Sequence, residues 1–258
     1  MLSYRKLAMR VLGRPLHTGG NDSPRPASQR AAAFILTVAM LTTLAAPAFA
    51  DTWCIENGNI TVKAGDTEGT NKVSQGTIID KVDTNTIITN SDKATASSNT
   101  VTIEANGKND KVEVTLKDVN IDTSSRNNAA VSVTGSCNTT IKLDGDNALK
   151  SDTYRSGIAS TGSLTISGGE NDSLTAQGGS GANGISSSGS LTISGGTVTA
   201  TGGNSTGIVG YGGSGIYSSS GVAISGGAVT ANGGDSKDGY GGNGIYLSLI
   251  HISEPTRP

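Results

Sequence analysis

Apolar and small polar residues alternate along the second half of the chain, and the alternation returns at a regular interval. Four segments open with Gly-Ile, at Gly157, Gly184, Gly215 and Gly244. The first three continue into a Ser-Gly-Gly and then into a closing Gly-Gly. A period of about thirty residues predicts one structural unit stacked on copies of itself.

The copies align side chain by side chain. Leu164, Leu191 and Val222 are equivalent, and small polar residues stand between the apolar ones with the period of two that is typical of strands. Each complete unit is therefore predicted to carry three short strands with an apolar core. The other core columns are Ile166, Ile193 and Ile224; Leu174, Val198 and Val229; and Ala176, Ala200 and Ala231.

A single unit cannot bury its apolar row alone, so successive units must stack around a common interior. We expect an all-β fold: a single-stranded, right-handed parallel β-helix with three short strands per coil. Less regular alternation between Trp53 and Leu149 predicts earlier coils of the same solenoid. At about 25 residues per coil, residues 51–246 would form about eight coils, with the first segment covering the open end.

The units differ in length mainly between the closing Gly-Gly and the next Gly-Ile. Loops of unequal length should therefore project from one edge, which is the expected functional surface. The glycine pairs at the corners are expected to adopt positive φ. Because Gly and Ser are abundant, disorder is an alternative, but the regular spacing of Leu-Thr-Ile-Ser-Gly-Gly and the absence of Pro from 51–246 favour the solenoid.

The first fifty residues carry a different pattern. A basic residue, Arg30, precedes an apolar stretch that ends with Pro47 and a small-x-small sequence at Ala50. This order predicts that residues 1–50 are a signal peptide with a long n-region, cleaved between Ala50 and Asp51. A transmembrane anchor is the alternative, because the apolar run is almost long enough to span a bilayer.

The last residues depart from the repeat, which predicts a Ser-Ser-Gly after Tyr246. Residues 247–258 instead resemble the translation of a transposase adapter used in sequencing libraries. We therefore expect this segment to be a sequencing artefact in a truncated reading frame, and the β-helix domain to cover residues 51–246.

Without these two ends the chain is acidic. Residues 51–246 hold 19 of the 21 Asp and Glu and 12 of the 19 Lys and Arg, so the net charge is 12 − 19 = −7. An acidic surface without basic clusters argues against nucleic acid as a partner. Both histidines, His17 and His251, lie outside the domain, which argues against zinc enzymes and Ser-His-Asp hydrolases.

Carboxylates are the remaining candidates for chemistry. Calcium ligation is one role, because calcium prefers carboxylate oxygens, and cleavage of carbohydrate is another. Each candidate also has a plain interpretation as a turn residue that bonds to nearby backbone. The calcium candidates are Asp144, Asp146, Asp235 and Asp238, and the catalytic candidates are Asp144, Asp146 and Asp152 with Arg155.

Four tyrosines recur at the repeat interval. Tyr211 and Tyr240 stand in matching Gly-Tyr-Gly-Gly segments 29 residues apart, and Tyr217 and Tyr246 follow Gly-Ile at the same spacing. Rings stacked on one edge would form a platform for the faces of sugars. The alternative is a structural ladder in which the rings of adjacent coils only pack on each other.

Three motifs carry a resemblance to a known group: Val114–Asp122, Asn138–Ser151, and the repeats typified by Ser190–Gly203. They make most of residues 51–246 resemble secreted bacterial proteins described as carbohydrate-binding-domain-containing. This is a pectate-lyase-like parallel β-helix group that is similar to Gly-rich surface repeats and adhesins. The resemblance implies binding of acidic or cellulosic polysaccharide without cleavage, in some members with calcium. The group's Asp-Gly-Ile signature is replaced here, for example by Asn183-Gly-Ile, which weakens the calcium expectation.

The sequence thus favours an exported, non-catalytic carbohydrate-binding or adhesin-type protein. It would be secreted or held at the surface of a bacterial cell, with a polysaccharide or a host glycan as partner and no stable membrane insertion within 51–246. Two alternatives remain open: a polysaccharide lyase or hydrolase of pectate-lyase-like fold, and a purely structural stalk of a larger surface protein. Calcium is the one cofactor the candidates suggest.

Overall fold

The structure is a computed structural model that describes residues 51–106, 111–205 and 210–248. All of them belong to one of the two units into which the chain divides, Ala48–Pro258. The expected signal peptide, including Ala50 at its cleavage site, lies outside the described residues, as do residues 249–258 of the expected artefact.

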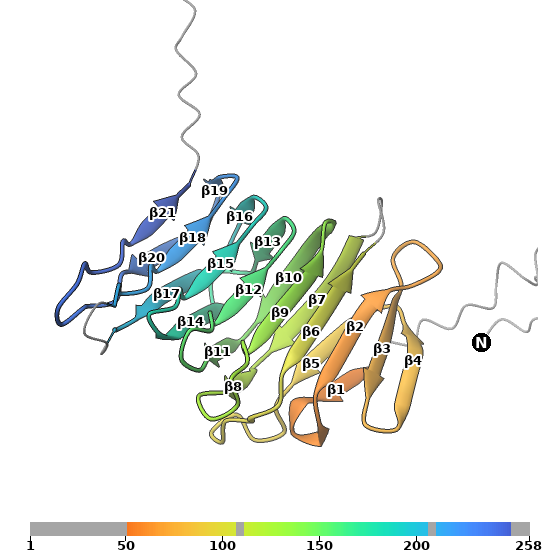
Figure 1. Cartoon of the computed structure of the whole chain (residues 1–258). Helices are drawn as coiled ribbons and strands as arrows, with labels where there is room; N and C mark the ends of the chain where they lie inside the picture. Colours follow the sequence, from red (N-terminus) through yellow and green to blue (C-terminus); the bar gives the residue numbers. More distant parts are fainter. Residues whose placement is uncertain (1–50, 107–110, 206–209, 249–258) are drawn as a thin grey trace, which may run out of the picture. The chain divides into compact units, whose positions relative to one another are not determined.

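Three sheets run side by side along the solenoid (Figure 1). In spatial order, sheet A contains β1 (Thr52–Cys54), β5 (Thr86–Thr89), β7 (Lys111–Lys117), β10 (Asn138–Asp144), β13 (Leu164–Ser167), β16 (Leu191–Ile193) and β19 (Val222–Ile224). Sheet C contains β8 (Asn120–Asp122), β11 (Asp146–Lys150), β14 (Ser173–Ser180), β17 (Thr197–Gly203) and β20 (Ala228–Asn232). Sheet B contains β4 (Ile78–Asp83), β3 (Asn71–Gln75), β2 (Ile60–Ala64), β6 (Val101–Ala105), β9 (Val131–Gly135), β12 (Ile158–Ser160), β15 (Ile185–Ser187), β18 (Ile216–Ser218) and β21 (Ile245–Leu247).

From β7 onward the chain visits sheets A, C and B in turn and then begins the next coil. Strands of successive coils pair in parallel, as β10 with β13, β14 with β17 and β12 with β15. The result is a parallel β-solenoid of about six turns. The expected all-β parallel β-helix with three short strands per coil is confirmed.

The sequence repeat is also the register of the sheets. Leu164 pairs with Leu191 and Leu191 with Val222, and Leu174, Val198 and Val229 pair in the same way. The inward-facing members of these columns are buried in all but the last described coil. One continuous apolar column therefore fills the interior, because every coil places its aliphatic side chains above those of the coil before it.

The first part of the solenoid differs from the expected winding. Asn71–Gln75 and Ile78–Asp83 form antiparallel strands, β3 and β4, that extend sheet B beyond β2. These residues form a hairpin and do not contribute a coil. The solenoid therefore has about six turns, whereas the sequence predicted about eight. Alternation with a period of two is the same in a hairpin and in a coil, and the pattern alone does not separate them.

Glycine serves two different purposes at the corners. Gly196 and Gly227, the second glycines of two Ser-Gly-Gly corners, have φ of +78°, as expected. The closing pairs do not adopt the left-handed region, so the expectation of positive φ is wrong there. A Cβ on Gly203 would collide with the carbonyl of Gly179 on the neighbouring coil. The closing glycines are required because backbones of successive coils approach closely.

Small polar residues complete the interior at the corner between sheets B and A. Ser160, Ser187 and Ser218 stand one above another, and all three are buried. The hydroxyl of Ser187 lies 3.0 Å from the carbonyl oxygen of Gly189, and that of Ser218 lies 2.9 Å from the carbonyl oxygen of Gly221. These hydroxyls bond to backbone carbonyls where the chain turns away from the sheet pairing.

The last described coil leaves its core positions open. Ile224 is 48% exposed, whereas its equivalents Ile166 and Ile193 are fully buried. Ile245 of β21 is also exposed. Within the described part of the chain, no helix is both long enough and apolar enough to cross a membrane.

Candidate functional site

The loops that join sheet C to sheet B form one edge of the solenoid, called the loop edge from here on. They connect β14 to β15, β17 to β18 and β20 to β21, and they differ in length. The loop before β21 projects beyond the strands (Figure 1). Tyr211 and Tyr240 lie in the last two of these loops, at the edge where the sequence places the functional surface.

Tyr211 and Tyr240 stack on each other across neighbouring coils. Their ring centroids are 5.9 Å apart and the ring planes differ by 7°. Both side chains are largely exposed, Tyr211 by 64% and Tyr240 by 75%. The rings therefore pack as a ladder and still present most of their surface to the medium, so the ladder and the platform are compatible.

The second pair lies on the adjoining sheet rather than in a loop. Tyr217 on β18 pairs in register with Tyr246 on β21, and the rings are 5.6 Å apart with 12° between their planes. The hydroxyl of Ser219 donates to the Tyr217 phenol oxygen at 3.2 Å. This bond and one from Ser248 lower the pKa of the Tyr217 phenol below its ordinary value.

On the outer face of sheet B, the coils before this tyrosine pair carry small residues at the same register position. Ser132, Ala159 and Ser186 occupy the same register column as Tyr217. Short side chains leave the sheet surface accessible in front of the rings. The column thus forms a flat strip that ends at two stacked aromatic residues.

Tyr154 is a further exposed aromatic residue on the loop edge that the sequence did not single out. It is 79% exposed and has a positive φ of 60° in the turn after β11. Together with Arg155 it forms the wall of a hollow of about 290 Å³, with Ser132 and Ala159 among its lining residues. Arg155 Nε is held in place by bonds of 3.2 Å to the backbone carbonyl and the side-chain oxygen of Asn127.

The ring of Tyr154 extends over the next coil at a glycine. A Cβ on Gly181 would lie 3.5 Å from Tyr154 Cε1 and 3.3 Å from the carbonyl oxygen of Tyr211. Gly181 therefore lies between the Tyr154 ring and the backbone of the Tyr211 loop. Tyr154 does not recur at the 29-residue spacing that links the other tyrosines, so the sequence period gave no signal for it.

A polar groove of about 410 Å³ follows the corner between sheet C and the loop edge. Its lining includes Lys150, Gln177 and Thr201, which stand in one register column of sheet C. Lys150 Nζ is 3.0 Å from a carboxylate oxygen of Asp122. Ammonium, amide and hydroxyl groups in a row offer both donors and acceptors to a hydroxyl-rich ligand.

The carboxylates singled out in the sequence are mostly engaged with their neighbours. Asp144 pairs with Lys117, whose Nζ lies 2.8 Å from Asp144 Oδ2. Asp146 accepts a bond of 2.8 Å from the hydroxyl of Ser173. These residues belong to the turn between sheets A and C, which agrees with the interpretation as turn residues.

Asp152 also stabilises a turn. Its two carboxylate oxygens accept the backbone N–H groups of Thr153 at 2.6 Å and of Asn127 at 2.7 Å. The hydrogen bond from Thr153, followed by the one from Asn127, holds the pKa of the Asp152 carboxyl below its ordinary value. Asp152 is therefore an ionised turn residue that links two coils.

The second calcium candidate lies in the loop before β21. The backbone N–H of Asp235 donates to Asn204 Oδ1 at 2.8 Å, and Asp238 is exposed in the same loop. Among the described residues, no three or more His, Cys, Asp or Glu side chains are grouped so that they could hold a metal ion. Calcium binding stays a prediction.

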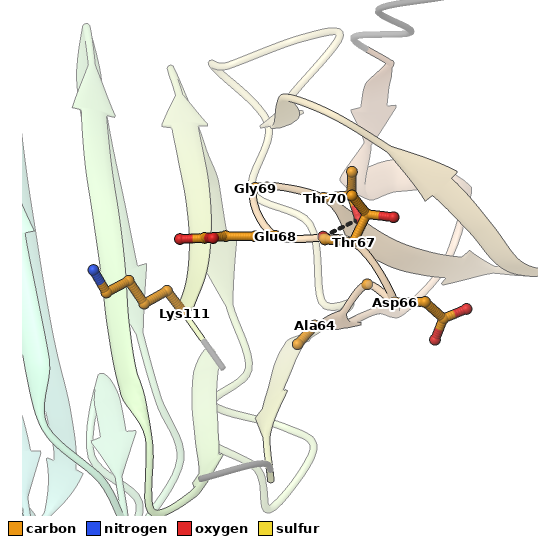
Figure 2. A pocket seen from close by; sticks show the side chains of 8 residues that line it. Ala64, Asp66, Thr67, Glu68, Gly69, Thr70 and Lys111 are labelled. Carbon is orange, nitrogen blue, oxygen red and sulfur yellow. Dashed lines mark hydrogen bonds between the residues drawn. The ribbon is translucent and has the colours of Figure 1, made fainter. Parts of the chain in front are cut away.

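Another pocket, of about 300 Å³, lies in the loop between β2 and β3, near the opposite end of the solenoid. Figure 2 shows Glu68 and Lys111 extending to the same side of this pocket while Asp66 points away from them. Asp66 is paired with Lys72 at 2.7 Å, and Thr70 Oγ1 donates to the carbonyl of Thr67 within the turn. The charged groups do not converge on a common point, so the loop edge is the better candidate site.

Comparisons of this chain with protein-family models, with curated proteins and with solved structures found no match. The geometry of the described residues therefore carries the functional argument.

Proposed function

We propose that this chain is an exported, non-catalytic carbohydrate-binding protein of adhesin type, which binds a polysaccharide or a cell-surface glycan along the loop edge. The observation that carries the proposal is the exposed stack of Tyr211 on Tyr240. The parallel stack of Tyr217 on Tyr246 on the adjoining sheet supports it.

Aromatic rings bind sugars because the apolar C–H face of a sugar ring packs on the ring while its hydroxyls bond to polar neighbours. The loop edge offers both kinds of group: Tyr154, Tyr211 and Tyr240 project from it, and the column of Lys150, Gln177 and Thr201 lines the groove beside it.

Repetition favours a polymeric ligand. The coils place similar groups at equal intervals along the axis, as the register of Tyr217 with Tyr246 illustrates. A polysaccharide repeats its own units, so several weak contacts act together and raise the overall affinity. A small sugar would use only one of these contacts and would bind more weakly.

The same geometry supports binding without cleavage. A general acid that protonates a glycosidic oxygen needs a raised pKa. The carboxyl of Asp152 has a lowered pKa, and both of its oxygens accept hydrogen bonds from backbone N–H groups. Asp144 is paired with Lys117. We therefore favour a binding protein over a lyase or hydrolase.

The test is retention of the full chain, produced in an exporting bacterial host, on a panel of insoluble and immobilised polysaccharides that includes pectins, glucans and cellulose. We expect retention on at least one. The double variant Tyr211→Ala/Tyr240→Ala should bind at least about tenfold more weakly, the equivalent of about 1.4 kcal/mol.

The matched control is Thr199→Ala/Thr230→Ala, which removes a paired column on the outer face of sheet C and leaves the tyrosines in place. Its binding should equal that of the wild-type chain. No retention on any polysaccharide would count against the proposal and favour a structural stalk. Release of new reducing ends or unsaturated products would instead favour the lyase or hydrolase.

A further inference from the structure

Asp83 is a buried carboxylate that the proposed binding edge does not use. It is the last residue of β4 and its side chain is fully buried. Oδ2 accepts the indole Nε1–H of Trp53 at 2.8 Å, and Oδ1 accepts the backbone N–H of Asn85 at 3.1 Å. Oδ1 also lies 3.2 Å from the backbone nitrogen of Asp51.

These three donors are neutral N–H groups as long as Asp51 is preceded by another residue. A buried carboxylate is bound more strongly by a cationic donor than by a neutral N–H group, because charge-assisted hydrogen bonds are the stronger ones. The nearby Lys81 is engaged elsewhere: its Nζ lies 2.7 Å from Asp51 Oδ2 and 5.8 Å from the centre of the Trp53 ring. The site thus places the buried carboxylate of Asp83, which has no cation paired with it among the described contacts, 3.2 Å from the nitrogen of Asp51.

We propose that Asp83 is the partner of a new N-terminus, the α-ammonium group that cleavage after Ala50 would create on Asp51. In that step a host peptidase adds water across the Ala50–Asp51 bond. The hydroxyl goes to the carbonyl carbon of Ala50, and the amine of Asp51 takes up protons to become an ammonium. The nitrogen that donates to Asp83 across 3.2 Å then carries a positive charge.

This change would turn a neutral contact into a charge-assisted hydrogen bond inside the fold. It would fix β1, whose residues pair with β5 at the first position of sheet A, and the buried indole of Trp53. Removal of the signal peptide would therefore also stabilise the first coil. The inference depends on cleavage at Asp51 and does not depend on carbohydrate binding.

The experiment compares two forms of the full chain: the precursor retained in the cytoplasm and the processed protein recovered after export, whose first residue is identified by N-terminal sequencing. The reactivity of the Asp51 amine with an acylating reagent is measured by mass spectrometry of the N-terminal peptide, before and after unfolding. We expect the amine of the folded, processed protein to react at least about tenfold more slowly than that of the unfolded chain, because an ammonium paired with a carboxylate is harder to deprotonate.

Asp83→Asn should abolish most of this protection while its side-chain oxygen still accepts the Trp53 N–H group. It should also lower the thermal unfolding midpoint of the processed form more than that of the precursor. The matched control is Asp80→Asn on the same strand, whose carboxylate pairs with the exposed Lys63, and it should leave the amine protected.

A processed protein that begins at a residue other than Asp51 would overturn the inference. An Asp51 amine that reacts equally fast in the folded and unfolded wild-type chain would also overturn the inference. This measurement uses the wild-type chain alone, so it is valid even if Asp83→Asn does not fold. An equal loss of stability from Asp83→Asn in both forms would assign Asp83 a structural role only and would likewise overturn it.

Discussion

Close approach between backbones decides which residue stands at a corner of this solenoid. Gly203 packs against the carbonyl of Gly179, and Gly234 against that of Gly203, so a column of glycines runs along the corner. These positions show no positive φ, and a side chain is excluded by space rather than by backbone conformation.

Replacing Gly203 with Ala should destabilise the protein by about 1–3 kcal/mol, because its Cβ must displace the backbone of the neighbouring coil. Gly241→Ala is the control, since its Cβ would meet only the carbonyl of Gly234 at an ordinary 3.5 Å. It should change the free energy of unfolding by less than about 0.5 kcal/mol. Equal effects of both substitutions in urea unfolding would contradict the packing argument.

Asp118 links the stability of a turn to pH. A hydrogen bond from the backbone N–H of Asp146, and a further one from Lys93 at 3.3 Å, lower the pKa of its carboxyl. A carboxyl whose pKa is lowered on folding adds stability above its unfolded value of about 3.9, and this stability is lost as the pH falls through the folded value.

The unfolding midpoint should therefore fall as the pH drops below about 4, and Asp118→Asn should make this fall shallower. Asn tolerates the positive φ of 50° at this position as Asp does, so the comparison isolates the charge. Thermal unfolding measured between pH 3 and 7 provides the test. If the unfolding midpoint of the variant falls with decreasing pH as steeply as that of the wild-type chain, Asp118 does not cause the pH dependence.

Among the strands, burial depends on having a neighbouring coil on both sides. Ile193 on β16 and Ile224 on β19 pair in register and hold equivalent positions of the repeat. Ile193 is fully buried, whereas Ile224 is 48% exposed. The two positions have the same residue followed by the same Ser-Gly-Gly corner, so they form an internal comparison.

Ile193→Ala should cost about 2–5 kcal/mol of unfolding free energy, because it leaves a cavity between two coils. Ile224→Ala should cost about 1 kcal/mol or less, since half of its side chain is already in contact with water. Urea unfolding of the two variants measures the difference. Similar losses would mean that the last described coil is covered in solution.

The strands and their register could be predicted from the sequence because each coil repeats the one before it. Leu164, Leu191 and Val222 occupy one column both in the repeat and in sheet A. The hairpin of β3 and β4 was not predicted, because Asn71–Asp83 has no repeated partner to compare with and β3 alternates as a coil strand does.

The tyrosine pairs followed from their spacing, whereas Tyr154 and Asp83 did not. Tyr154 has no equivalent in the repeat, and its position depends on the space left by Gly181 one coil further on. The sequence analysis did not single out Asp83, whose buried carboxylate accepts the indole N–H of Trp53, thirty residues earlier in the chain. Contacts between distant, unrepeated residues leave no periodic signal.

The described part of the solenoid presents its exposed aromatic groups on the loop edge and on the adjoining sheet, whereas its two most exposed large aliphatic residues stand on β4 near the other end. Ile79 is 71% exposed and Val82 is 53% exposed. Because these β4 residues lie away from the proposed binding edge, they serve as an internal control in an experiment that locates a bound polysaccharide.

Hydroxyl-radical footprinting of the exported full chain, with and without the polysaccharide that retains it, tests the proposed binding edge most directly. We predict that the polysaccharide slows the oxidation of Tyr211 and Tyr240 at least about threefold and leaves Ile79 on β4 unchanged, because bound sugar excludes solvent from the ring surfaces. Unchanged oxidation of both tyrosines, or protection centred on Ile79, would contradict the account.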